Sequence, residues 1–276
     1  LSGLTLAILL SRKGYEIDLI TKDEYPVKRV CGEYISWESA GLLRYLGVDI
    51  DSDFFPKINR LEISNTKGKI YTSQLKQGGI GISRDYLDKK LVDIAEGLGV
   101  KIHFENRIIQ EENNNGLFYI KTQYNKEFHT KLYINCLGKL SGKTLRNNYE
   151  KNSWIGIKYH LKYDLDNKTI SLHNFKNGYA GISAVEGNLV CFCYLVKTEE
   201  LKKHGSIEML EEKNLKNNPR IKKILENSEV YGKRAVISNF TFEKKSPFID
   251  GLIYAGDSAG LIAPLCGNGM SMAFHS

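Results

Sequence analysis

Leu252-Ile253-Tyr254-Ala255-Gly256-Asp257-Ser258-Ala259-Gly260 is the most informative stretch of the sequence, and it continues through Pro264 into Cys266-Gly267-Asn268-Gly269-Met270-Ser271. The pattern predicts a buried strand that ends at Gly-Asp, a turn of small residues and a glycine-rich entry into a helix. Glycines remove the steric barrier of a Cβ atom, and the first amides of a helix favour anionic groups. The stretch therefore predicts a site where backbone amides and the Asp257 carboxylate approach a polar ligand closely.

The composition is that of a folded globular protein. The chain has 276 residues, of which 42% are hydrophobic and 26% charged, and these fractions are ordinary for soluble domains. Its formal charge of +7 comes from dispersed lysines and arginines, which indicates a solvated basic surface and no nucleic-acid platform. No apolar run reaches the length of a membrane-spanning helix, so no transmembrane segment is expected, while peripheral contact with a membrane stays open.

The cysteines favour a reduced protein. They are odd in number and include no Cys-x-x-Cys pair and no Cys/His ligand spacing: Cys31, Cys136, Cys191, Cys193 and Cys266. This pattern argues against a disulfide framework and against a structural metal site. We therefore expect a cytoplasmic protein without a bound metal.

The beginning of the chain is typical of half a βαβ unit. Residues 1–14 form an apolar helical pattern that ends at Gly14, and the alternation from Tyr15 to Ile20 predicts a strand. If a strand and Gly-x-Gly preceded Leu1, then Gly3 would be the third glycine of a dinucleotide fingerprint, which lets helix and strand pack closely. The sequence starts inside a helical pattern and stops inside another, so we expect a chain truncated at both ends.

A loop further along carries a resemblance to a known family. A basic stretch leads to Val30-Cys31-Gly32-Glu33 and then to Ser36, a predicted N-cap for a helix from Trp37 to Leu46. This arrangement resembles the geranylgeranyl reductase branch of the FAD-dependent oxidoreductases, which share a fold with the aromatic hydroxylases and flavin halogenases. The resemblance implies that this loop lies against the flavin.

Two further elements fit the resemblance, with one departure. The run from Ser83 to Leu91 is similar to the family's Arg-x-x-Leu-Asp-x-x-Leu element, in which the arginine, here Arg84, points toward the cofactor. The strand from Leu132 to Gly138 stands where the family has a strand ending in Asp-Gly, but Leu137 replaces the acid. Gly138 still permits a close approach of the backbone to a cofactor.

The chain from Trp154 onward reads as an antiparallel sheet. Alternating apolar residues predict strands with one covered face, followed by amphipathic helices packed outside them. Gly178-Tyr179-Ala180-Gly181 stands where the family has a pocket-lining Gly-Tyr-x-Trp stretch, so the resemblance places Tyr179 and Gly181 in the substrate pocket. Since Gly181 replaces a tryptophan, we expect a reshaped pocket wall.

The residue patterns predict an α/β protein with an antiparallel sheet, and the resemblance implies a Rossmann-like, three-layer FAD-binding part and a substrate role for that sheet. The expected divisions are an FAD-binding domain with a small inserted β-meander at 1–150, the substrate-side sheet with its outer helices at 151–235, and a return to the FAD-binding domain at 236–276. The resemblance implies an FAD-dependent oxidoreductase that acts on an apolar or lipid-like small molecule and whose flavin is reduced by NAD(P)H or another donor. A monooxygenase using O₂ and a flavin-binding or interaction protein without turnover remain alternatives.

The residues expected at the site follow from the same motifs. No side chain stands out as an acid, base or nucleophile, and Cys31 is a weak catalytic candidate. The expected cofactor-binding residues are Gly3, Arg29, Cys31, Gly32, Arg84, Gly138, Gly256, Asp257, Pro264, Gly267, Asn268, Gly269 and Met270.

Overall fold

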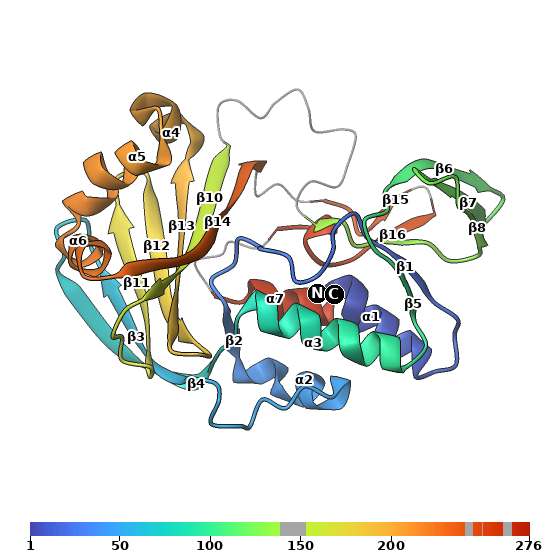
Figure 1. The fold of residues 1–276 in the computed structure, drawn as a ribbon, viewed down its shortest axis with the longest axis horizontal. Helices are drawn as coiled ribbons and strands as arrows, with labels where there is room; N and C mark the ends of the chain where they lie inside the picture. Colours follow the sequence, from blue (N-terminus) through green and yellow to red (C-terminus); the bar gives the residue numbers. More distant parts are fainter. Residues whose placement is uncertain (139–152, 241–244, 250, 262–266) are drawn as a thin grey trace.

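The computed structural model describes residues 1–138, 153–240, 245–249, 251–261 and 267–276. A large curved sheet with helices on its outer face lies beside a group of helices and short parallel strands (Figure 1). The predicted α/β class is confirmed. Pro264, one of the residues expected at the cofactor, lies outside the described residues.

The dinucleotide-type part consists of parallel strand pairs and helices. Helix α1 (Ser2–Ser11) leads to β1 (Asp18–Ile20), and β1 pairs in parallel with β5 (Lys101–His103), which follows α3 (Arg84–Gly97). A second sheet pairs β16 (Leu252–Tyr254) in parallel with β9 (Ile134–Asn135), and β15 (Phe248–Ile249) adds an antiparallel edge. The stretch from Leu252 to Gly260 thus contains the predicted strand, β16, followed by the short 3₁₀ turn Gly256–Ser258.

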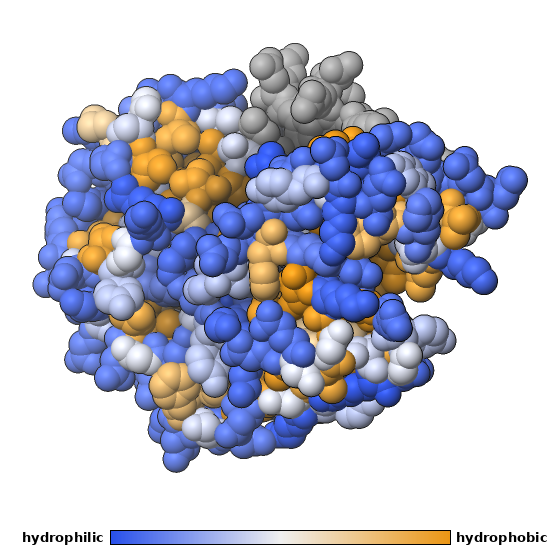
Figure 2. Space-filling view, turned by 45° about the vertical axis from the view of Figure 1, so that its right-hand side comes forward, coloured by the Kyte–Doolittle hydropathy of each residue, from blue (hydrophilic) through white to orange (hydrophobic). Residues whose placement is uncertain are grey.

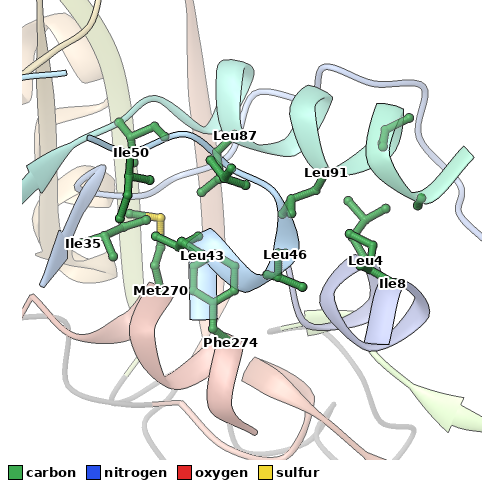
Figure 3. Packing of buried hydrophobic residues seen from close by; sticks show 14 of the residues in the cluster. Leu4, Ile8, Ile35, Leu43, Leu46, Ile50, Leu87, Leu91, Met270 and Phe274 are labelled. Atoms are coloured by element: carbon green, nitrogen blue, oxygen red, sulfur yellow. The ribbon is translucent and has the colours of Figure 1, made fainter. Parts of the chain in front are cut away.

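One core joins the two ends of the chain. Side chains of α1, α2 (Ala40–Leu46), α3 and α7 (Gly269–His275) meet in it (Figure 3). The residues labelled there include Leu4, Leu46, Leu91, Met270 and Phe274, all less than 5% exposed. The Ser2 hydroxyl also donates a hydrogen bond of 2.7 Å to the carbonyl of Ala273. The stretch after β16 is therefore anchored to the first turn of α1.

The large sheet has eight strands in the order β14-β10-β13-β12-β11-β3-β4-β2. All neighbouring pairs are antiparallel except β11 and β3. The bounds are β2 Tyr34–Ser36, β3 Lys57–Ser64, β4 Ile70–Gly81, β10 Trp154–Lys162, β11 Thr169–Phe175, β12 Gly178–Val185, β13 Leu189–Lys197 and β14 Glu229–Phe240.

The sheet takes in more of the chain than the segment 151–235. Strands β2, β3 and β4 come from the first 81 residues, and β14 runs on to Phe240. Strand β4 continues to Gly81 because its glycines let its backbone approach its neighbours closely. A Cβ atom on Gly79 would lie 2.2 Å from the carbonyl oxygen of Ile35, and one on Gly81 would lie 1.8 Å from that of Ala184.

Helices cover one face of this sheet, as predicted. They are α4 (Thr198–His204), α5 (Ile207–Lys213) and α6 (Pro219–Glu226), and their apolar residues pack against alternate residues of β10 and β13. On β10 the covered residues are Ile155, Ile157, Tyr159 and Leu161. Strand alternation turns Gly156, Lys158 and His160 to the opposite face, toward the dinucleotide-type part.

The remaining elements are small. An antiparallel meander of β6 (Ile108–Asn114), β7 (Leu117–Thr122) and β8 (Glu127–Thr130) follows β5, as predicted. The helix expected from Trp37 begins as a 3₁₀ turn before α2, and the Ser36 side chain makes no capping hydrogen bond. Figure 2 shows that hydrophilic residues cover most of one face of the molecule, with apolar residues in separate groups between them.

Candidate cofactor and substrate site

A cavity of about 1720 Å³ connects the dinucleotide-type part with the uncovered face of the large sheet. One end is lined by the first turn of α1, the loop from Arg29 to Glu33, Arg84 and Asp257. The other end is lined by side chains of β11, β12 and β13. Segments from both ends and the middle of the sequence therefore meet in one space.

The first turn of α1 borders this cavity, and no hydrogen bond joins its first amides to another described residue. Leu1, Ser2 and Gly3 line it, and no side chain caps the helix. A helix whose first N–H groups have no partner favours an anionic group there. A Cβ atom on Gly3 would lie 3.3 Å from the Cβ of Cys136, so the missing side chain lets α1 pack tightly beside the residue that follows β9.

The Gly-Asp turn lies directly against that helix end. Gly256 has a φ of 63°, and a Cβ atom there would lie 2.1 Å from the hydroxyl oxygen of Ser2. Gly256 does not line the cavity itself, whereas its neighbour Asp257 does. Only glycine combines this backbone conformation with so close an approach, and the turn thereby directs Asp257 toward the same end of the cavity as α1.

Hydrogen bonds hold the ends of β9 and β16 together. The amide of Ala255 donates to the carbonyl of Asn135 at 3.1 Å, and the amide of Gly138 donates to the hydroxyl of Ser258 at 2.7 Å. Gly138 has a φ of 79° and lines the cavity. Although Leu137 occupies the position of the expected acid, the backbone beyond β9 still reaches the cavity.

The two arginines expected at the cofactor both have carboxylate partners. Arg84 donates two hydrogen bonds to Asp88, of 3.0 and 2.8 Å, and Arg29 donates one of 2.8 Å to Asp23. Burial would lower the pKa of Arg84, but the Asp88 charge outweighs it and raises that pKa. Arg84, at the start of α3, thus pairs with Asp88 one turn further along the same helix, and it also lines the cavity.

The loop from Arg29 to Glu33 forms a wall of the cavity and leans on the large sheet. The carbonyl of Gly32 accepts a hydrogen bond of 2.9 Å from Ser183, and that of Cys31 accepts one of 3.3 Å from the thiol of Cys191. Both Cys31 and Gly32 line the cavity. The loop therefore stands between the cofactor end and the sheet.

Glu33 belongs to this wall, although sequence reasoning did not select it. Its side chain is fully buried and contacts Lys158 and His160 of β10. The sequence of β10 contained a signal for such a residue, because Lys158 and His160 lie on one face of the strand while the residues of the other face are apolar. Charged groups on the inward face of a strand require a buried partner, and Glu33 supplies it.

The sheet end of the cavity is apolar. Tyr179 and Gly181 line it together with Leu172, Cys193 and Leu195. Gly181 lies opposite Cys193 in the register of β12 and β13. A Cβ atom on Gly181 would make an ordinary contact of 3.6 Å with Leu172, so packing does not require a glycine at this position.

Most of the residues expected at the site gather at one cavity. Those that line it are Gly3, Arg29, Cys31, Gly32, Arg84, Gly138, Tyr179, Gly181, Asp257, Gly267, Asn268, Gly269 and Met270. Their roles stay predictions. Among the described residues, no three His, Cys, Asp or Glu side chains gather as a metal site would require. Every helix in the described residues is too short or too polar to span a bilayer.

Comparison with solved structures identifies the fold. The chain matches a flavin-dependent brominase with a TM-score of 0.81 and 16% identity, over 99% of this chain and 73% of that one. The fold is that of FAD-dependent flavoproteins. A geranylgeranyl bacteriochlorophyll reductase-like protein from Thermoplasma acidophilum matches with a TM-score of 0.78 and 19% identity, over 99% and 72% of the two chains. A halogenase solved with phloroglucinol and FAD matches with 0.76 and 15%, over 99% and 65%.

These similarities lie in the fold. No protein-family model matches the sequence, and no curated protein matches it. The flavoprotein fold agrees with the predicted Rossmann-like architecture and its antiparallel sheet.

Proposed function

We propose that this protein is an FAD-dependent oxidoreductase acting on an apolar, lipid-like small molecule. The observation that carries the proposal is the single cavity, whose one end offers backbone amides and Asp257 and whose other end is an apolar sheet face. A cofactor with a polar dinucleotide and a flat reactive ring needs both kinds of surface in one space. NAD(P)H is the proposed electron donor.

The residues of the cofactor end fit FAD. The uncapped first turn of α1 suits a phosphate, and the Asp257 carboxylate can accept hydrogen bonds from hydroxyl groups of the ribityl or ribose chain. Gly267, Asn268, Gly269 and Met270 provide backbone near the same end. When bound, FAD supplies the transfer of hydride or electrons to the substrate. The chain's own part is to bind, to orient the substrate on the sheet face and to exclude water.

The apolar sheet end supports a neutral substrate. Leu172, Cys193 and Leu195 line it, and the buried Lys158 and His160 of β10 are hydrogen-bonded to Glu33. A carboxylate or phosphate group of a substrate would lose its hydration against these apolar side chains. The name of the geranylgeranyl reductase-like neighbour favours reduction of a carbon–carbon double bond.

Monooxygenation with O₂ is the second candidate, favoured by the halogenase bound to phloroglucinol and FAD, which has the same fold. Anaerobic turnover separates the two reactions: a reductase converts its substrate with reduced flavin in the absence of O₂, and a monooxygenase does not. A third reading, flavin binding without turnover, is favoured by Leu137 at the place of the expected acid. It predicts that the protein binds flavin but that no electron donor reduces this flavin and no substrate reoxidises it.

Reconstitution with FAD tests the proposal as a whole. The purified protein is mixed with FAD, freed of excess cofactor and examined for flavin absorbance and for protein-bound flavin fluorescence. We expect a stoichiometric yellow complex that NAD(P)H bleaches under anaerobic conditions. A protein that stays colourless after reconstitution contradicts every version of the flavoenzyme proposal.

Asp257→Ala is expected to weaken FAD binding by about 10- to 100-fold, because a hydrogen bond to a charged group contributes roughly 1.5–3 kcal/mol. Cys31→Ser, also in the cavity wall, is the control and is expected to change the dissociation constant less than about threefold, a difference of under 1 kcal/mol. Titration of each apoprotein with FAD measures both. Equal effects of the two substitutions would overturn the role given to Asp257.

Gly181→Trp is expected to block the sheet end while leaving FAD bound. The indole would extend into the cavity that Gly181 and Leu172 line, so binding of geranylgeraniol, used as a neutral lipid-like probe, should weaken on the order of tenfold or more. Gly181→Ala is the control, since its Cβ atom makes only an ordinary contact at 3.6 Å. Flavin fluorescence during titration reports probe binding, and unchanged affinity in the tryptophan variant would remove Gly181 from the pocket.

A further inference from the structure

A buried cluster of charges lies at the junction of the two parts. One carboxylate oxygen of Glu33 accepts hydrogen bonds from the Lys158 ammonium at 2.6 Å and from the backbone amide of Arg84 at 2.8 Å. The other lies 2.6 Å from Nε2 of His160. The side chains of Glu33, Lys158 and His160 are 0%, 1% and 4% exposed.

Glu33 thus connects three elements. Its side chain joins the loop to β10 and to the first residue of α3, and its carbonyl accepts a hydrogen bond of 2.9 Å from the amide of Ile82, at the end of β4. Its φ of 54° is unusual for a residue other than glycine. Such a conformation costs about 1–2 kcal/mol and persists only where the surroundings fix it.

Stability alone does not explain this cluster. A buried ion pair is often no more stabilising than well-packed apolar side chains of the same volume, because both charges lose their hydration. What it adds is a defined geometry, since each hydrogen bond fixes a direction as well as a distance. Glu33 fixes the loop before β2 and the start of α3. These two elements bring Cys31, Gly32 and Arg84 to the cofactor end of the cavity.

We propose that Glu33 is a positioning residue for the flavin: with Lys158, His160 and the first amide of α3, it holds the loop from Arg29 to Glu33 and the Arg84 end of α3 in the arrangement that receives the ring system. This inference rests on the proposed function. Glu33 acts through the loop and α3, and it takes no part in the chemical step.

A matched pair of substitutions tests it. Glu33→Gln removes the charge and keeps the shape. Glu211→Gln makes the same change in a carboxylate on the opposite, helix-covered face of the sheet, where it is 8% exposed and accepts hydrogen bonds from Tyr159 and Tyr194. Both variants change a buried carboxylate that is hydrogen-bonded to β10, but only Glu33 borders the cavity.

Hydrogen exchange of the flavin-free protein is the first readout. The amides of Arg84 and Ile82, which donate hydrogen bonds to Glu33, should exchange about tenfold faster in Glu33→Gln than in the wild type, and at the wild-type rate in Glu211→Gln. The second readout is FAD itself. In Glu33→Gln, the absorption spectrum of bound FAD should shift, and the affinity for FAD should weaken about tenfold. Glu211→Gln should lower the melting temperature and leave both unchanged.

Equal exchange rates and equal flavin spectra in the two variants would overturn the positioning role, as would a Glu33 variant that differs only in melting temperature. If Glu33→Gln does not fold, Glu33→Gln/Lys158→Met replaces it, because this pair leaves no unpartnered buried charge, and the same outcomes apply. A wild-type protein that binds no FAD would refute the proposed function. The exchange rates of the Arg84 and Ile82 amides would still decide whether Glu33 holds the loop against α3 and β4.

Discussion

Gly256→Ala is expected to lower the free energy of unfolding by about 2–4 kcal/mol and to weaken FAD binding. The φ of 63° at this position disfavours any side chain, at about 1 kcal/mol. The new Cβ atom would lie 2.1 Å from the Ser2 hydroxyl, which already donates a hydrogen bond to Ala273. Relieving the overlap therefore displaces the first turn of α1 or breaks its tie to α7, at about 1–3 kcal/mol.

Gly260→Ala is the matched control, four residues further along the same stretch. Among the described residues, no heavy atom would lie within 4 Å of a Cβ atom there, and its φ is not in the left-handed region. We expect this variant to differ from the wild type by less than about 0.5 kcal/mol. Urea unfolding and FAD titration of both variants measure the difference. If the two alanines behave alike, the close approach of the Gly-Asp turn to α1 is not needed for the site.

The Gly-Asp stretch could be interpreted from the sequence because its signals are local. A buried strand, a turn of small residues and a following helix each leave a pattern within a few positions. The same holds for α3, whose Ser83 cap accepts a hydrogen bond from Tyr86, and for the strands of the antiparallel sheet from Trp154 onward. The ion pair of Arg84 with Asp88, four residues apart on one helix, was also within reach of sequence reasoning.

Contacts between distant segments were not predictable in this way. Glu33 and Lys158 are 125 positions apart in the sequence, and no periodicity indicates which buried acid pairs with which base. The place of β3 and β4 in the large sheet was missed for a related reason. The parallel pairing of β3 with β11 joins residues more than 100 positions apart, and strand pairing over such distances is fixed by the whole fold.

Lys158→Met is expected to lower the free energy of unfolding by about 3–5 kcal/mol at neutral pH. Methionine fills a similar volume, but the variant leaves the fully buried Glu33 carboxylate without its cation. Lys162→Met on the same strand is the control: its ion pair with Glu229 spans 3.3 Å, and the lysine side chain is 54% exposed. The exposed pair of Lys162 with Glu229 should contribute less than about 1 kcal/mol to the free energy of unfolding, so Lys162→Met should lower it by no more than that.

The difference between Lys158→Met and the wild type should depend on pH. Burial would raise the pKa of Glu33, but the hydrogen bond from His160 and the Lys158 charge outweigh it and lower that pKa from its ordinary value of 4.5 to about 2. A carboxylate with a lowered folded-state pKa stabilises the protein fully above its unfolded value and loses this contribution as the pH falls. In the wild type, the loss should occur between about pH 4.5 and about pH 2.

Without Lys158, burial acts on Glu33 with less opposition, so the folded-state pKa rises toward or above the unfolded value. The variant then has little stability to lose on acidification, since protonation relieves its unpartnered charge. The gap between the two unfolding free energies should therefore be largest near pH 7 and should narrow as the pH falls below 4.5, the ordinary value of the carboxyl. Urea unfolding across this range measures the gap, and a gap that stays constant would mean that Lys158 stabilises the fold by packing and not by its charge.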